Sequence, residues 1–122
     1  MYRILILVIM HIAGDFLLQG KTLSRLKASK VTALLAHVGI YTLFFIAISP
    51  LLLGLTFIQG LIFSSINAAT HLVIDFFTAK FKKIYWQQSE GKYLAVISID
   101  HILHILILIT TYIYMYPEAL KF

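Results

Sequence analysis

Long apolar stretches separated by short polar breaks dominate the chain. Four of these stretches are each about as long as the roughly 20 residues that a helix needs to cross a hydrocarbon core of about 30 Å. They predict helices over residues 2–19, 31–53, 55–78 and 93–116. None of them carries the continuous polar face that a helix shows in a water-soluble bundle. The pattern therefore predicts an all-α polytopic membrane protein with a single domain over residues 1–122.

Composition and charge agree with a membrane setting and orient the predicted helices. Hydrophobic residues make up 61% of the chain, charged residues only 12%, and the mean hydropathy is +0.93. Eight of the ten Lys and Arg residues lie in the first and third breaks. Because basic loops stay in the cytoplasm, loops 20–30 and 79–92 are expected there and both termini outside. Basic residues clustered in two loops also argue against a nucleic-acid-binding surface.

The two halves of the chain share a weak repeat. HIAGDF at residues 11–16 in the first predicted helix matches HLVIDF at residues 71–76 in the third, and His37 in the second matches His101 in the fourth. Short breaks between helices favour antiparallel neighbours. The expected arrangement is therefore two antiparallel hairpins related by a pseudo-two-fold axis along the membrane normal.

The polar residues inside the apolar stretches are unusual, because every His and every Asp of the chain lies within a predicted helix. At about 1.5 Å per residue, seven of them lie roughly 5 to 14 Å from the cytoplasmic helix ends and the eighth roughly 18 Å. Residues three or four apart share a helix face, so these side chains are expected to point toward one another. The candidate site residues are His11, Asp15, His37, His71, Asp75, Asp100, His101 and His104.

Charge inside a bilayer needs compensation, because each ionised side chain costs at least about 2.5 kcal/mol to insert. A divalent metal is one compensation: with no Cys in the chain, the donors would be His and Asp, which suit zinc and also manganese or iron. Eight donors would serve one or two ions. A proton or ion relay is a second compensation, and His–Asp hydrogen bonds that only hold the helices together are a third.

Further residues can be assigned around such a centre. Gln19 and Asn67 are expected to orient ligands or to pack between helices, and Tyr41 is expected in the core. Asp15 or Asp75, near the cytoplasmic mouth, is the expected general base. The basic residues of the two loops either fix topology only or also hold anionic lipid head groups.

The segments HIAGDFLLQ, LLAH, HLVIDF and DHILH together resemble an uncharacterised family of small bacterial inner-membrane proteins, a domain of unknown function. More loosely, the layout is similar to membrane-bound proteins described as metal-dependent hydrolases. The first resemblance implies a location in the bacterial inner membrane. The second implies a metal and a hydrolytic reaction.

Three functions follow as hypotheses. The first is a membrane-embedded metal-dependent hydrolase, with its His/Asp centre in the cytoplasmic half of the bilayer, acting on a lipid or phosphoester-type substrate. The second is a carrier or channel for a divalent cation or protons, working as a homo-oligomer. The third is a structural or regulatory membrane subunit whose buried His–Asp pairs specify assembly.

Overall fold

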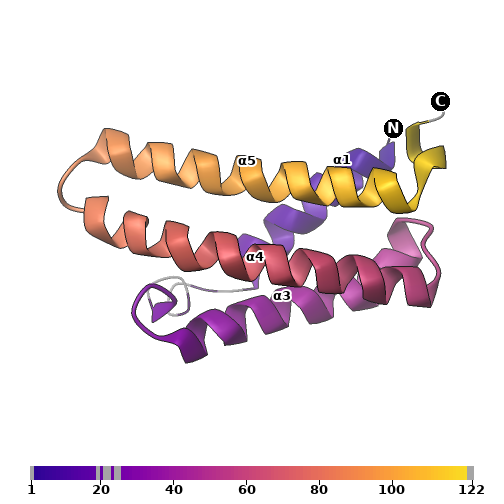
Figure 1. Ribbon diagram of the computed structural model, residues 1–122, viewed down its shortest axis with the longest axis horizontal. Helices are drawn as coiled ribbons and strands as arrows, with labels where there is room; N and C mark the ends of the chain where they lie inside the picture. The colour runs from indigo at the N-terminus through magenta and orange to yellow at the C-terminus, as the bar shows by residue number, and fades with distance from the viewer. Residues whose placement is uncertain (1, 19, 21–22, 24–25, 121–122) are drawn as a thin grey trace.

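Helices make up nearly all of the protein (Figure 1). The computed structural model describes residues 2–18, 20, 23 and 26–120. The elements are α1 (Tyr2–Ile12), the π-helical turn η1 (Ala13–Leu17), α3 (Val31–Leu52), α4 (Phe57–Tyr85), α5 (Glu90–Met115) and the 3-10 helix η2 (Pro117–Leu120). Because η1 continues α1 directly, the described residues form four main helices. The prediction of an all-α chain with four helices is confirmed.

Three of the four helices are long and apolar enough to cross a membrane. They are α3, α4 and α5, with 22, 29 and 26 residues and mean hydropathies of 2.1, 1.4 and 2.0. These helices suggest an integral membrane protein. The first helix, α1 with η1, has 11 and 5 residues and is shorter than the roughly 20 needed for a span. Gln19, where the sequence predicted its end, lies outside the described residues.

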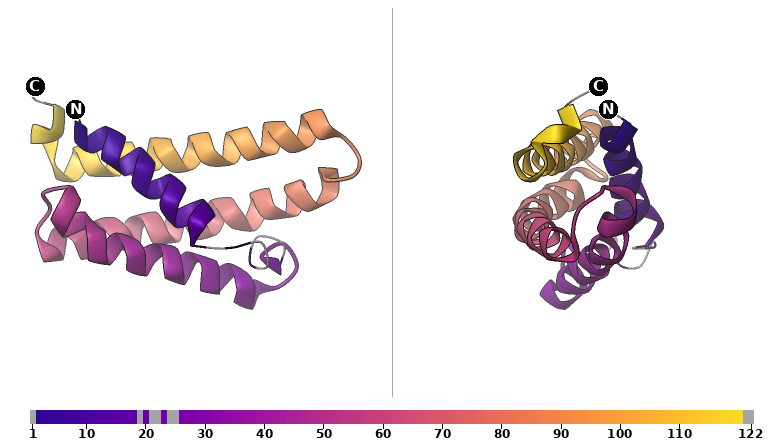
Figure 2. Two further views of the ribbon diagram at one scale, coloured as in Figure 1. Left: turned by 180° about the vertical axis from the view of Figure 1, so that it is seen from behind. Right: turned by 90° about the vertical axis from the view of Figure 1, so that its right-hand side faces the viewer.

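The long helices pack as antiparallel neighbours, with α4 between α3 and α5 (Figure 1). The first helix crosses them obliquely and contacts both α5 and α3 (Figure 2). Both termini and the α3–α4 turn lie at one end, called the terminal end below. The α4–α5 turn and residues 26–30 lie at the other, called the lysine end. The pseudo-two-fold relation stays a prediction, and the two repeated segments differ locally, since one enters a π-helical turn and the other is regular α-helix.

Local signals in the sequence explain where the long helices begin. The Thr56 side chain accepts a hydrogen bond from the Gln59 backbone at 3.2 Å, and the Gln59 side chain accepts one from the Thr56 backbone at 2.9 Å. This reciprocal cap satisfies two backbone donors that the first turn of α4 leaves free. At the start of α5 the cap is one-way, with the Ser89 side chain accepting a hydrogen bond from the Lys92 backbone. Gly54, with φ of +70°, supplies the left-handed conformation that lets the chain turn between α3 and α4.

Helix α4 is longer than the sequence predicted. It was expected to end near Thr78, with residues 79–92 forming a basic loop, but it continues to Tyr85. Lysine is a good helix former, and basic residues in the last turn interact favourably with the helix dipole. Lys82 is also held by a carboxylate of α5, described below. The lysines that the topology rule assigned to a loop therefore lie on a helix.

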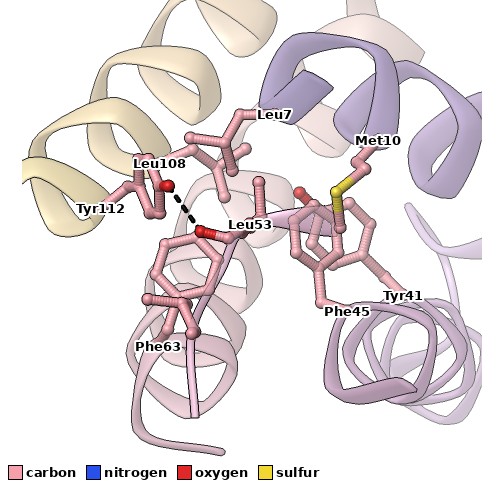
Figure 3. Close-up of a cluster of buried hydrophobic side chains, with 9 residues drawn as sticks. Leu7, Met10, Tyr41, Phe45, Leu53, Phe63, Leu108 and Tyr112 are labelled. Carbon is pink, nitrogen blue, oxygen red and sulfur yellow. Dashed lines mark hydrogen bonds between the residues drawn. The ribbon is translucent and has the colours of Figure 1, made fainter. Parts of the chain in front are cut away.

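A hydrophobic cluster fills the bundle toward the terminal end (Figure 3). In Figure 3 the Tyr112 hydroxyl donates a 2.7 Å hydrogen bond to the Leu53 carbonyl, which ties α5 to the α3–α4 turn. In every helix the cluster residues lie on the terminal side of the His and Asp positions. The buried members are Leu7, Met10, Tyr41, Phe45, Leu53, Leu55, Phe63, Leu108 and Tyr112.

The π-helical turn brings the first helix into close contact with α3 at Gly14. A Cβ atom at this position would lie 2.9 Å from Cδ2 of the Tyr41 ring and 3.3 Å from the Phe44 ring. Tyr41 is buried, so its ring has little room to move. Glycine is therefore required here for packing.

We expect Gly14→Ala to destabilise the protein by about 1 to 3 kcal/mol, because the added methyl group overpacks against Tyr41. The matched control is Gly39→Ala, since a Cβ at Gly39 meets no atom within 4 Å and alanine is the better helix former. Thermal unfolding of both variants in detergent micelles measures the difference. Equal melting temperatures for the two variants would contradict the proposed contact.

Candidate metal centre

The eight His and Asp residues selected from the sequence lie together inside the bundle. Seven of them are buried, with at most 4% of their surface exposed, and His101 is partly buried. The first helix supplies His11 and Asp15, and α3 supplies His37. The other five come from α4 and α5: His71, Asp75, Asp100, His101 and His104.

Four donor atoms form a tight central group at the meeting point of η1, α3 and α4. His37 Nε2 lies 3.0 Å from Asp15 Oδ1, 3.1 Å from Asp75 Oδ2 and 3.0 Å from His71 Nε2. His71 Nε2 lies 3.2 Å from Asp75 Oδ2 and 3.5 Å from Asp15 Oδ1. We call these four residues the central group. Their ligand atoms are close enough together to hold one metal ion.

The central group has the dimensions of a tetrahedral metal site. Five of the six distances between its four donor atoms are 3.0 to 3.5 Å. Ligands about 2.0 to 2.1 Å from a tetrahedrally coordinated ion are separated by roughly 3.3 to 3.4 Å. Four of the observed separations, 3.0 to 3.2 Å, are slightly shorter than that value and the fifth, 3.5 Å, is slightly longer.

Hydrogen bonding among the four residues does not satisfy all five contacts at once. With both carboxylates ionised, the only protons available are those on Nε2 of His37 and Nε2 of His71. If both nitrogens carry a proton, the 3.0 Å contact between them brings two N–H groups together, and if only one does, the lone pair of the other nitrogen faces carboxylate oxygens. A cation at the centre turns all five contacts into favourable ones, which supports a metal over simple His–Asp pairing.

A second group adjoins the central one through Asp15. It consists of His11, Asp15 and His101, and we call it the flanking group. His101 Nδ1 lies 3.5 Å from Asp15 Oδ2, the oxygen that faces away from His37. His11 Nδ1 is 3.0 Å from the Tyr41 hydroxyl, while His11 Nε2 and His101 Nδ1 are buried without a hydrogen-bond partner. Asp15 thus presents one oxygen to each group.

A third group adjoins the central one through Asp75 and consists of Asp75, Asp100 and His104. His104 Nδ1 donates a 2.7 Å hydrogen bond to the Asp100 carbonyl, which leaves Nε2 as the acceptor nitrogen of a neutral ring. That Nε2 lies 3.6 Å from Asp75 Oδ1, and both atoms lack a hydrogen-bond partner. The Asp100 carboxylate is already occupied by the Thr78 hydroxyl at 3.0 Å and Lys82 at 2.5 Å.

Two lysines neutralise two of the three buried aspartates. Lys27 Nζ contacts Asp75 Oδ2 at 3.0 Å, and the lysine itself is only 6% exposed. Lys82 Nζ contacts Asp100 Oδ2 at 2.5 Å. The described Lys and Arg side chains form no ion pair with Asp15, whose charged or polar neighbours are histidines. With neutral histidines the centre carries an excess negative charge, which attracts a cation.

Sequence reasoning missed several residues that the structure places around the centre. Lys27 and Lys82 were expected at the cytoplasmic surface, yet each reaches a buried aspartate. Thr78 and Tyr41 hold Asp100 and His11. Tyr41 is one turn from His37 along α3, and this spacing was the available sign of its role. For the lysines no local pattern distinguishes a topology signal from a buried ion pair.

Of the two amide residues expected near the centre, Asn67 is described by the structure and Gln19 is not. Asn67 is buried on α4, one turn from His71, and its side chain donates a 2.9 Å hydrogen bond to the Phe63 carbonyl. It therefore caps a carbonyl of its own helix. Gln19 lies outside the described residues, as do Lys21 and Arg25 of the first basic loop.

The fold and the buried donor groups define a helical protein of membrane character that could hold metal ions in a His/Asp centre. The chain belongs to the family described as "Protein of unknown function (DUF3307)", whose model matches residues 4–121. The predicted membership of an uncharacterised family is thereby confirmed, and no finding links the chain to the hydrolases. The chain matches no curated protein and no solved structure.

We expect Lys27→Met to destabilise the EDTA-treated protein by about 3 to 5 kcal/mol, because it leaves the buried Asp75 charge without its cation. Lys30→Met is the matched control, since Lys30 is exposed in the same segment. Unfolding of both variants in micelles measures the free energy. If the two variants are equally stable, Lys27 does not neutralise Asp75.

Proposed function

We propose that the protein is a membrane-embedded metal-dependent hydrolase that acts on a lipid or phosphoester-type substrate. The observation that carries the proposal is the position of Asp15, whose two oxygens face the central group and the flanking group, and in the flanking group His11 Nε2 and His101 Nδ1 lack a hydrogen-bond partner. A carboxylate that bridges two ions about 3.5 to 4 Å apart is the arrangement used by two-metal hydrolases. A site that only joins helices has no need of two adjoining donor groups.

Zinc is the metal we propose, with manganese or iron as alternatives. Two imidazoles and two carboxylates in a tetrahedral arrangement suit zinc, and no Cys is available for softer ions. One ion would occupy the central group and a second the flanking group. When bound, such ions lower the pKa of a coordinated water toward about 7 and polarise the substrate oxygen.

The two aspartates expected to act as general base have different environments. Asp15 has both oxygens directed at metal donors, so we assign it as the bridging ligand. Asp75 uses Oδ2 in the central group, but its Oδ1 is buried without a hydrogen-bond partner. We therefore assign Asp75 Oδ1 as the group that takes the proton from water, with His104 Nε2 beside it at 3.6 Å.

The position of the hydrophobic cluster favours an enzyme over a channel within one chain. The cluster lies between the centre and the terminal end on all four helices, whereas lysines reach the centre from the opposite end. By the positive-inside rule we place the lysine end in the cytoplasm and both termini outside. Ions would then enter from the cytoplasmic side, at the end opposite the cluster.

Metal analysis of the purified protein tests the first half of the proposal. After reconstitution with zinc and removal of free ions, we expect about two ions per chain by mass spectrometry, one in the central group and one in the flanking group, because Lys82 and Thr78 already occupy the Asp100 carboxylate of the third group. His71→Ala should lose the central ion and weaken zinc binding more than about 100-fold. Ser98→Ala, on the exposed face of α5, is the control and should bind as the unaltered protein does. No stoichiometric metal with zinc, manganese or iron would refute the hydrolase.

Turnover tests the second half of the proposal. The zinc-loaded protein should release product from a panel of phospholipids and soluble phosphoesters, and EDTA treatment should abolish release. Asp75→Asn should retain metal at the flanking group but lose most activity, because it removes the proposed base. Zinc flux into liposomes without hydrolysis would instead support a carrier.

A further inference from the structure

We infer that the flanking group is where substrate binds and that it opens sideways, between η1 and α5, to the lipid phase. The substrate would then be a phospholipid that enters from within the bilayer. This inference rests on the proposed hydrolase and narrows its substrate class. Two observations support it. The central and flanking groups offer different numbers of protein ligands, and His101 lies beside exposed apolar side chains.

The two groups differ in how many protein ligands they offer. The central group has four donors, which complete a tetrahedron and leave no position for a substrate. The flanking group has three donors, two imidazoles and one carboxylate. Catalytic zinc sites keep three protein ligands and one open position for water or substrate. The central ion would therefore hold Asp15 in place, and the flanking ion would carry the reacting water.

His101 is the member of the centre that reaches the surface. Its side chain is 20% exposed, whereas the side chains of Asp15, His37, His71 and Asp75 are at most 3% exposed. Its ring contacts Phe16 of the π-helical turn, with centroids 4.8 Å apart. Phe16 itself is exposed. The edge of the flanking group thus meets the outer surface of the bundle where the short first helix passes α5.

The surface around this edge is apolar and belongs to the part of the bundle that faces lipid. Apart from Phe16, which contacts His101, the residues next to these two positions in the sequence include the exposed hydrophobic side chains Leu17 and Ile102. Binding of a small soluble phosphoester is not favoured by an apolar surface, because desolvation of its charges costs free energy and it has no apolar groups to bury there. Acyl chains match it, and the head-group end of the same molecule would reach the open metal position.

The reaction that this placement implies is hydrolysis with water as the only co-reactant. The water oxygen forms a bond to the phosphorus of the lipid phosphoester, and the bond from phosphorus to the leaving oxygen breaks. The proton lost by the water would pass to the spare Asp75 oxygen, and Asp75 would then give it to the leaving oxygen, which departs as an alcohol. No oxidant or reductant is needed.

A pair of phenylalanine variants tests the opening directly. We expect Phe16→Trp to lower turnover of phosphatidylglycerol in vesicles on the order of tenfold, because the larger ring covers His101. Turnover of p-nitrophenyl phosphate, a small soluble probe, should fall less than turnover of the lipid, because a smaller molecule still passes the larger ring, and the zinc content should stay within about twofold. Phe77→Trp is the matched control, since Phe77 is similarly exposed on α4.

His101→Ala provides a readout that does not depend on catalysis. His101→Ala should remove the flanking ion and lower the zinc content from two ions to one, and this variant should remain folded because its central group is intact. His71→Ala should instead remove the central ion. A cobalt-substituted sample of His101→Ala should then show the spectrum of the closed four-ligand site alone.

The possible results separate the lateral opening from the hydrolase itself. Absence of all turnover by the zinc-loaded protein would refute the hydrolase and, with it, this inference. Turnover that is faster with the soluble probe than with vesicles, or equal effects of Phe16→Trp and Phe77→Trp, would overturn the lateral opening alone. Full zinc content in His101→Ala would show that His101 is not a ligand and would also overturn the inference.

Discussion

Negative charge buried between apolar helices is the constraint on which this structure depends. Three carboxylates lie almost fully out of contact with solvent, and none of them is tolerated there without a positive partner. Two partners are lysines that approach from one end of the bundle, and the remaining compensation falls to the histidines or to cations that they bind. The positions of the polar residues, the extension of α4 and the burial of Lys27 all follow from this requirement.

The distances within the central group help to decide whether its four residues only hold helices together or also bind a metal ion. Hydrogen bonds cannot satisfy all five close contacts of the central group at once, because the His37–His71 contact needs one protonated and one unprotonated nitrogen. The separations are close to those around a tetrahedral ion, which favours metal binding. The same shortage of donors extends to His11, His101 and His104, and six of the seven buried side-chain atoms that lack a hydrogen-bond partner among the described residues belong to the His and Asp residues of the centre.

The sequence predicted much of the fold and the identity of the layer, for physical reasons that can be named. An apolar run long enough to span a bilayer forms a helix, because a helix satisfies the backbone hydrogen bonds within the segment. A spacing of four residues places His71 and Asp75 on one helix face. The sequence could not predict which oxygen of Asp15 meets which histidine, because that depends on a π-helical turn that no residue pattern announces. It also placed Lys82 in a loop, since a lysine after an apolar run has the same appearance whether it stays in water or turns back to a buried acid.

The lysine pairs have a consequence for how the chain enters a membrane. Asp100 is neutralised by Lys82, which lies on the neighbouring helix of the same hairpin. Asp75 is neutralised by Lys27, which immediately precedes the helix that pairs with its own. Each hairpin therefore carries its own counter-charge during biogenesis and can be inserted by the cellular machinery before the bundle is complete. The histidine neighbours of Asp15 lie on three other helices, α3, α4 and α5. Packing of the first helix against the assembled hairpins is therefore the expected last step of folding.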